Sequence, residues 1–232
     1  MKDAWRHFLA EFIGTFALVF VGSGAIIRVA ATGGSLAEVA LAHGLILSVM
    51  VTALMRISGH FNPAVTATFM VTRRIEPVMG VVYMIAQFTG AIIAAFALKG
   101  LLPAAAVEST RVGGQMIASS ISFGGAIALE AIATFFLVWV IFGTAVDPKA
   151  PRVGGFAIGL TIAADILVIG PFTGASMNPA RSLGPAVASG VFEAQAVFWI
   201  GPLIGAIAAG VLYDRLFLRR GPEPVDHGAV AP

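Results

Sequence analysis

The tetrapeptide Asn62-Pro63-Ala64-Val65 has a near copy in the second half of the chain, Asn178-Pro179-Ala180-Arg181. Asparagine is a favoured N-cap, and proline suits the first helical position because its missing N–H would have no partner there. Each Asn-Pro-Ala is therefore predicted to begin a helix. The segments that follow, 62–71 and 178–188, are too short to cross a membrane. Ten helical residues rise ~15 Å, about half of the ~30 Å hydrocarbon core.

The composition is that of an integral membrane protein. Hydrophobic residues make up 58% of the 232 residues and charged residues 11%, and the mean hydropathy is +0.94. Soluble domains carry about 25% charged residues. The net charge of +2 is too small to indicate a nucleic-acid partner, so the predicted environment is a lipid bilayer. The first apolar run is long enough for a retained span rather than a cleaved leader.

Apolar runs predict six membrane-spanning helices and thus an all-α membrane protein. One channel domain is expected over 1–220, followed by a disordered cytoplasmic tail over 221–232, which is polar and rich in proline. The expected spans are 8–29, 36–57, 78–102, 123–146, 153–169 and 194–218.

The two halves of the chain, 8–102 and 123–218, are related by sequence. Glu11-x-x-x-Thr15 in the first span matches Glu130-x-x-x-Thr134 in the fourth. A repeat of three spans is odd-numbered, so the second copy must be inverted in the membrane. Inverted repeats with broken helices that meet at the midplane are typical of a transport path.

Lysine and arginine indicate the orientation, because cytoplasmic segments carry an excess of them. Placing both termini in the cytoplasm puts ten basic residues on or near that side and leaves three outside. We therefore predict a multi-pass protein of the cell (plasma or inner) membrane. The inner set is Lys2, Arg6, Arg56, Arg73, Arg74, Lys149, Arg152, Arg215, Arg219 and Arg220, and the outer set is Arg28, Lys99 and Arg111.

The predicted half-helices would form a site for water where their N-termini meet. Each N-terminus carries about half a positive charge, which repels cations. The side-chain amides of Asn62 and Asn178 can donate to one water oxygen, so that this water points its hydrogens outward and interrupts a proton wire. Backbone carbonyls of the entry segments would accept hydrogen bonds from passing water. These are predicted to be Gly59, His60 and Phe61 in the first half, and Gly174, Ala175 and Ser176 in the second.

Glu11 and Glu130 are carboxylates within spans, which admits two interpretations. Either each accepts hydrogen bonds from a half-helix entry loop and holds it rigid, or the pair relays protons. Asp165 is expected to pair with Arg181 or His43, or to lie in an outer vestibule.

No catalytic or metal site is predicted. The chain has no cysteine, and its four histidines, His7, His43, His60 and His227, are scattered without ligand spacing. The protein is therefore expected to be neither an enzyme nor a cofactor carrier.

The paired Asn-Pro-Ala motifs, the Glu-x-x-x-Thr repeats and the six-plus-two layout resemble the aquaporin, or major intrinsic protein, family over about 10–213. The stretch from Gly174 to Pro185, GASMNPARSLGP, is highly specific to it. The resemblance implies a homotetramer with one pore per subunit that passes water. Ser182 and Ala186 resemble the water-channel branch, whereas glycerol facilitators usually carry aspartate and a basic residue there.

The resemblance also implies a selectivity filter of His43, Ile166, Ala175 and Arg181. This set is similar to that of plant tonoplast-type channels, which often pass ammonia, urea or hydrogen peroxide as well as water. The loop before Asn62 is one residue shorter than usual. Depending on where that gap lies, either His43 or Ala42 faces the filter. The alternatives are a facilitator of glycerol or other neutral solutes and, more remotely, a proton-coupled secondary transporter.

Overall fold

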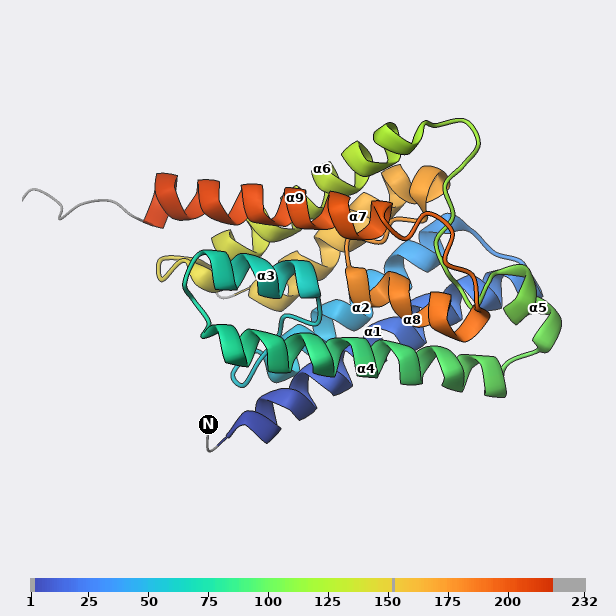
Figure 1. Cartoon of the computed structure of the whole chain (residues 1–232), viewed down its shortest axis with the longest axis horizontal. Coiled ribbons are helices and arrows are strands. Elements are labelled where there is room, and N and C mark those ends of the chain that lie inside the picture. The colour runs from blue at the N-terminus through green and yellow to red at the C-terminus, as the bar shows by residue number, and fades with distance from the viewer. Residues whose placement is uncertain (1–2, 152, 219–232) are drawn as a thin grey trace, which may run out of the picture.

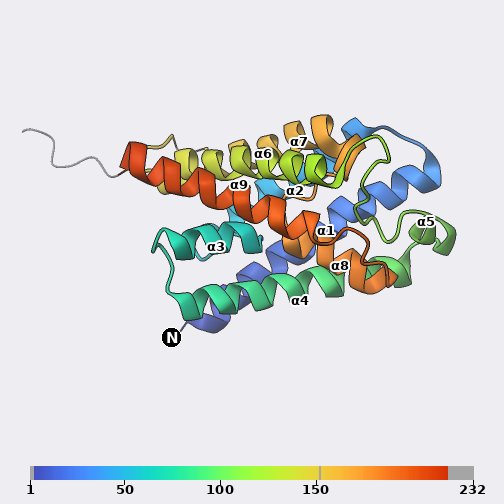
Figure 2. The same cartoon turned by 45° about the horizontal axis from the view of Figure 1, so that its top comes forward.

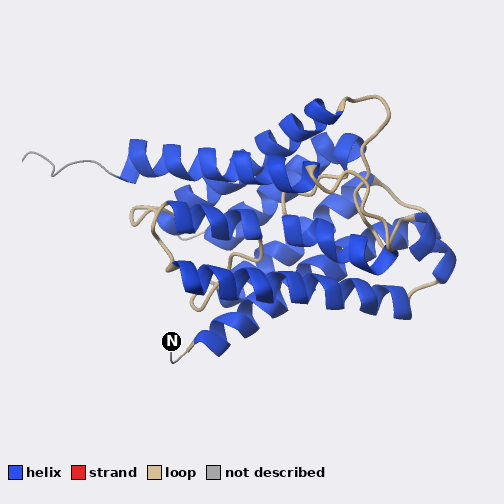
Figure 3. Cartoon of the chain, in the orientation of Figure 1, coloured by secondary structure: helices blue, strands red, loops and turns tan. Residues whose placement is uncertain are grey.

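A computed structural model of the chain describes residues 3–151 and 153–218. Every regular element within these ranges is helical (Figure 3). The predicted cytoplasmic tail, 221–232, lies outside the described residues.

Six helices are long and apolar enough to cross a membrane, which confirms the predicted fold class. Two shorter helices, α3 (Pro63–Val71) and α8 (Pro179–Ser189), begin directly after Asn62 and Asn178. The sequence did not predict α5 (Ala104–Ser109). The six spans are α1 (Ala4–Thr32), α2 (Leu36–Leu54), α4 (Pro77–Leu101), α6 (Phe123–Ile141) continued by η1 (Phe142–Val146), α7 (Gly154–Thr173), and α9 (Val197–Tyr213) continued by η2 (Asp214–Leu218).

Helix α7 is longer than predicted. It was expected to end at Ile169, ahead of Pro171, but it continues through the proline to Thr173. A proline in the last turn removes a single helical hydrogen bond, and the helix ends where Gly174 adopts a left-handed conformation with φ of 77°.

The packing of the helices follows the inverted repeat. Helix α1 packs on α4 as α6 packs on α9, and α2 packs on α7 across the two halves. Each half-helix packs on the last span of the other half, α3 on α9 and α8 on α4. Figure 2 shows α3 and α8 in one row between α9 and α4, with their N-termini toward each other. The two short helices therefore form a single broken span at the centre.

Glycines permit the close contacts within each half. A Cβ added to Gly90 in α4 would lie 2.5 Å from the carbonyl oxygen of Phe12 in α1. At the matching position, a Cβ on Gly205 in α9 would overlap the carbonyl oxygen of Ala131 in α6. Between membrane helices such small residues allow the backbones to pack directly.

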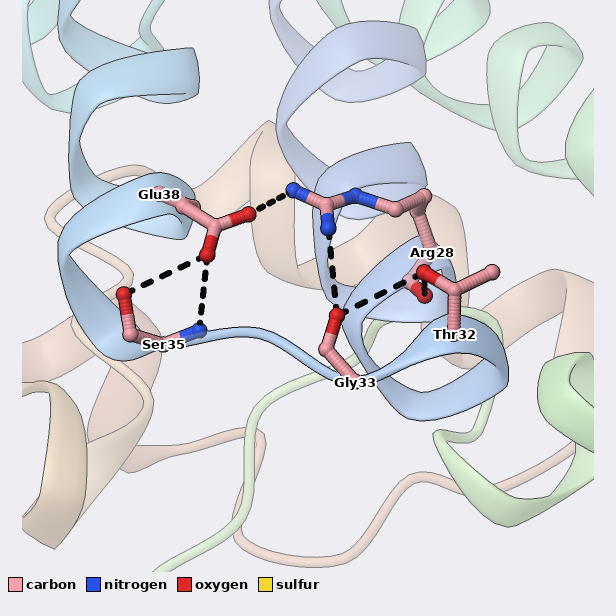
Figure 4. A network of polar contacts seen from close by, with 5 residues as sticks. All are labelled: Arg28, Thr32, Gly33, Ser35 and Glu38. Carbon is pink, nitrogen blue, oxygen red and sulfur yellow. Dashed lines mark hydrogen bonds and ion pairs between the residues drawn. The ribbon is translucent and has the colours of Figure 1, made fainter.

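Polar contacts fix the turn between α1 and α2 (Figure 4). Arg28 pairs with Glu38 and donates to the carbonyl of Gly33 at 3.1 Å. Glu38 also accepts from the backbone N–H of Ser35 at 3.1 Å, which makes a capping box at the start of α2. Thr32 donates to the carbonyl of Arg28 at 3.0 Å. The first two spans are thereby joined as a rigid hairpin.

Helix α1 begins and η2 ends at the same end of the molecule (Figure 1). We call this end the N-terminal face and the other end the opposite face. The described part of the chain thus enters and leaves the membrane on one side, as an even number of spans requires. This agrees with the predicted multi-pass topology.

We expect Gly205→Ala to lower the thermal stability of the detergent-solubilised protein, because the new methyl group overlaps the Ala131 carbonyl. Overpacking typically costs about 1–3 kcal/mol. Gly100→Ala is the matched control. A Cβ there meets nothing within 4 Å, so the substitution should be neutral or stabilising by about 0.5–1 kcal/mol through helix propensity. Equal unfolding midpoints for the two variants, measured by size-exclusion after heating, would contradict the close α6–α9 contact.

Candidate functional site

The two asparagines of the repeated motif cap the half-helices at the centre of the molecule. The side-chain oxygen of Asn62 accepts the backbone N–H of Ala64 at 2.9 Å. That of Asn178 accepts the N–H groups of Ala180 at 2.9 Å and of Arg181 at 3.2 Å. Both asparagines are extended residues ahead of a proline at the first helical position, as the sequence predicts.

Each asparagine also bonds to the loop of the other half. The Nδ2 of Asn62 donates to the carbonyl of Met177 at 2.7 Å, and the Nδ2 of Asn178 donates to the carbonyl of Phe61 at 2.8 Å. We call this pair of bonds the asparagine clasp. An amide nitrogen carries two hydrogens, so each asparagine keeps one for another acceptor.

A narrow cavity of about 30 Å³ runs past the clasp. A water needs roughly 10–15 Å³ of such volume, so the cavity has room for about two or three water molecules. It adjoins a cavity of about 250 Å³ on the N-terminal face, with which it shares Val51, Gly59, His60, Ile141 and Ile158. Toward the opposite face it adjoins a cavity of about 530 Å³, with which it shares Ile166. The narrow cavity therefore lies between two larger ones, one toward each face.

Most of the wall of the narrow cavity is apolar. Such a wall offers a passing molecule few hydrogen-bond partners besides the asparagines, Arg181 and the loop carbonyls. Outside the two entry loops, the apolar lining residues are Leu18, Leu47, Val51, Val65, Leu137, Ile141, Ile158, Ile162 and Ile166.

The four residues predicted for the filter, His43, Ile166, Ala175 and Arg181, all line this cavity. The Nε2 of His43 lies 3.2 Å from an Nη of Arg181, and its Nδ1 lies 2.8 Å from the carbonyl of Val39. Arginine only donates, so Nε2 must accept and Nδ1 must carry the proton. The Nε and the other Nη of Arg181 are buried without a partner and can donate to a molecule in the cavity.

Ala42 lies elsewhere. It lines a separate, mostly apolar hollow between α1, α2 and the end of α4, together with Phe20, Val21 and Leu98. The structure therefore places His43 rather than Ala42 at the cavity.

One of the six residues predicted to supply pore carbonyls, Gly174, lies apart from the other five. Gly59, His60, Phe61, Ala175 and Ser176 line the narrow cavity, whereas Gly174 lines the larger cavity toward the opposite face. Met177 takes the third place in the second half, and its carbonyl is engaged by Asn62. The reason is the greater length of α7, which makes Gly174 its C-cap and starts the entry segment later.

The two buried glutamates hold the entry loops. Glu11 accepts the N–H groups of His60 at 2.8 Å and Phe61 at 2.7 Å, together with Ser58 Oγ and Gln87 Nε2. Glu130 accepts the N–H groups of Ser176 at 2.9 Å and Met177 at 2.7 Å, together with Thr173 Oγ1 at 2.7 Å. Neither glutamate is among the residues that line the narrow cavity.

These bonds stabilise an unfavourable backbone conformation. Phe61 and Met177, the residues directly before the two asparagines, have φ of 48° and 52°. Side chains other than glycine rarely adopt the left-handed region, and such residues cost on the order of 1–3 kcal/mol. Each glutamate bonds the N–H of the strained residue and so fixes the direction of its carbonyl.

Neither expectation for Asp165 is met, and a second polar residue, Gln115, was not anticipated. Asp165 neither bonds to Arg181 or His43 nor lines either cavity, and one of its oxygens is buried without a partner among the described residues. Gln115, in the loop before α6, packs against Gly174, and both of its amide atoms are likewise buried and unpaired. Sequence gave no signal for Gln115, because an irregular loop has no periodicity to place it.

We expect Glu130→Gln to destabilise the protein, because an amide replaces an accepting oxygen with a donor and leaves Ser176 or Met177 N–H unpaired. An unsatisfied buried group costs about 1–3 kcal/mol. Glu193→Gln is the matched control. Glu193 is exposed and pairs with Arg111 at 2.8 Å, so its loss should change stability by at most about 0.5 kcal/mol. Equal thermal midpoints for the two variants would show that Glu130 does not hold the loop.

Comparisons with known proteins agree with this geometry. The model of the major intrinsic protein family matches residues 1–213. The chain is 39% identical to probable aquaporin TIP3-2 of Arabidopsis thaliana, over 99% of this chain and 90% of that protein. It is 42% identical to aquaporin TIP2-1 of the same plant, over 92% of this chain and 88% of that protein.

A similar solved structure is that of the aquaglyceroporin from Plasmodium falciparum. The TM-score is 0.81 at 27% sequence identity, and the match covers 92% of this chain and 96% of that one. Members of the matched family are passive channels and not enzymes. The chain therefore belongs to the major intrinsic protein family, the aquaporins and their relatives.

Proposed function

We propose that this protein is a passive channel for water that excludes protons and other ions. The observation that carries the proposal is the asparagine clasp beside a cavity with room for only about two or three waters. The naming of its relatives as aquaporins supports it.

The clasp leaves Asn62 and Asn178 with one N–H each, and both side chains line the same cavity. A water that accepts both bonds has its two hydrogens directed along the path, away from the centre. Its neighbours on either side then point their hydrogens outward as well, so no continuous chain of donors exists for proton transfer. The positive ends of α3 and α8 add an electrostatic barrier to cations and hydronium.

The selectivity filter of the proposed channel is formed by His43, Ile166, Ala175 and Arg181. The unpaired Nε and Nη of Arg181 can replace hydrogen bonds that a water loses on entry, while its charge repels cations. Ile166 and Ala175 contribute small apolar surfaces. Small neutral solutes such as ammonia, urea or hydrogen peroxide fit this opening better than a filter with two aromatic rings would allow.

Glycerol conduction is the second candidate, because the structural neighbour is an aquaglyceroporin. The hydrogen bond between His43 and Arg181 places two polar side chains across the cavity. This favours conduction of water and the smaller neutral solutes over conduction of glycerol. Proton-coupled transport is disfavoured, because Glu11 and Glu130 already accept bonds from the loops and do not line the cavity.

The assembly proposed from the family is a homotetramer in a lipid bilayer, in which residues 1–220 of each subunit form one channel domain with its own pore. The similarity to TIP-type aquaporins favours a vacuolar membrane, in a cell that has one, over the plasma or inner membrane predicted from sequence. Cross-linking in native membranes would test the assembly, and fractionation would test the location.

Water conduction is tested with purified protein in liposomes. We expect the rate of osmotic shrinkage, measured by stopped-flow light scattering, to be several-fold higher than in empty liposomes and to depend weakly on temperature. A pH-sensitive dye inside the same liposomes should report no added proton leak. A macroscopic proton or cation current across a planar bilayer would refute the proposed channel.

The filter is tested with a pair of neighbouring substitutions. His43→Phe should narrow the cavity and remove the partner of Arg181, which lowers urea or ammonia flux more than water flux. Ala42→Phe is the control. Its side chain enters the separate hollow between α1, α2 and the end of α4, so the ratio of solute to water flux should stay unchanged. If Ala42→Phe changes this ratio and His43→Phe does not, His43 is not a residue of the filter.

A further inference from the structure

The hollow between α1, α2 and the end of α4 lies apart from the path of the proposed channel. Its volume is about 510 Å³, and it shares no lining residue with the narrow cavity or with the cavities next to it. Small residues leave the space open, since Gly24 and Ala25 line it from α1 and Ala42 lines it from α2. Val21 and Ala31, which also line it, are exposed. The hollow therefore opens on the outer surface of the first half, and we call it the outer hollow.

The outer hollow is charged at one end and apolar along the rest of its length. Among the residues that line it, Arg28 and Glu38 are the charged ones. They lie beside the turn between α1 and α2, at the opposite face of the molecule (Figure 4). The lining residues of α1 run from Phe20 to Thr32, a helical rise of ~18 Å, which is close to half of the ~30 Å hydrocarbon core. The hollow thus has the length and the polarity of a lipid in one leaflet.

The two charged side chains have hydrogen-bonding capacity to spare. A guanidinium has five N–H groups, and the bonds from Arg28 to Gly33 and Glu38 use two of them. A carboxylate has about four acceptor sites, of which the bonds from Arg28 and Ser35 to Glu38 use three. The side chain of Arg28 is 49% exposed and that of Glu38 is 43% exposed. A cation and an anion therefore stand side by side at the polar end, and each is open to a further partner.

We propose that the outer hollow binds a phospholipid whose headgroup carries both a phosphate and a primary ammonium, which is a phosphatidylethanolamine. The phosphate accepts hydrogen bonds from Arg28, the ammonium donates to Glu38, and one acyl chain lies along Gly24 and Ala25. The inference goes beyond the proposed channel function. It requires that the chain lies in a bilayer, but not that it conducts water.

The charge pair selects this headgroup over other lipids. An anionic headgroup such as phosphatidylglycerol offers a phosphate to Arg28, but it has no cation for Glu38, which repels it. A choline headgroup has a cation, but its quaternary nitrogen has no hydrogen to donate. Ethanolamine supplies a charge-assisted hydrogen bond to each member of the pair, and such bonds are stronger than neutral ones. The apolar walls contribute affinity to any of these lipids, so the pair determines the preference.

The polar end is tested by titrating the purified protein with lipid and measuring binding by native mass spectrometry. The probes are dioleoyl phosphatidylethanolamine and dioleoyl phosphatidylglycerol, which have the same chains. Wild type should bind the ethanolamine lipid about two- to five-fold more tightly, the range expected for an exposed ion pair. Glu38→Gln should abolish this preference while keeping the start of α2 intact, because glutamine also completes a capping box. Arg28→Gln should weaken binding of both lipids.

The apolar part is tested by filling the outer hollow. Ala25→Leu should weaken binding of both lipids by about ten-fold, since each CH₂ group displaced from an apolar site costs about four-fold in affinity. Ala128→Leu is the matched control, because Ala128 is an exposed residue of α6 that does not line the hollow. The ethanolamine lipid should also raise the unfolding midpoint of wild type and Ala128→Leu, and raise it less in Ala25→Leu.

Equal binding of the two lipids to wild type, or unchanged binding in Ala25→Leu, would show that the protein is surrounded by lipid without a specific site, and would overturn the proposal. If Ala25→Leu instead changes the number of copies in the assembly and leaves lipid binding as it was, a second copy of the chain covers the hollow and the proposal is wrong. The binding measurements do not depend on conduction. A protein that binds the ethanolamine lipid as expected but passes no water refutes only the proposed function.

Discussion

A backbone amide at the middle of a bilayer must find a partner within the protein, because lipid offers none. The two entry loops leave the helical conformation at that depth, and Glu11 and Glu130 supply the acceptors that their N–H groups lack. The other features of the pore depend on this. With the amides of Phe61 and Met177 held, these residues keep their left-handed backbone, and their carbonyls turn toward the opposite half. There each carbonyl meets the side chain of an asparagine, and the clasp closes.

The clasp makes each half of the inverted repeat a structural support for the other. The Asn178 oxygen that caps α8 also accepts the N–H of Arg181. The backbone of Arg181 is thereby bonded to the side chain that also donates to Phe61 in the first half. At its far end α8 is held by Lys99 from α4, which donates to the carbonyl of Ala188 at 2.6 Å. A cation there also interacts favourably with the negative end of the helix dipole. Helix α8, which carries Arg181, is therefore held at both ends by groups distant in sequence, the carbonyl of Phe61 and the side chain of Lys99.

Much of this architecture could be predicted from the sequence, because it depends on local rules. Asparagine and proline fix where α3 and α8 begin, and apolar length fixes the six spans. The end of α7 could not be predicted, since a proline normally signals a break, and only the tertiary structure shows that the helix ends at Gly174 instead. The bonds from each asparagine to the other loop, and the position of Gln115, depend on three-dimensional contacts that no periodicity encodes.

Buried polar atoms that have no partner in the described part of the chain show where a passing molecule can be bound. Glu11 and Glu130 accept hydrogen bonds from the hydroxyls of Ser58 and Thr173 and from N–H groups of the loops. These groups are therefore bonded within the protein and are not free to bind a solute. The donors that remain at the narrow cavity are one N–H on each asparagine and the unpaired nitrogens of Arg181. All of these are donors, and they stand opposite apolar walls. In the proposed channel, these donors serve a small neutral molecule with an accepting oxygen or nitrogen, and the charge of Arg181 opposes a cation. We therefore infer that the selectivity of the proposed channel follows from which polar groups the fold leaves without a partner.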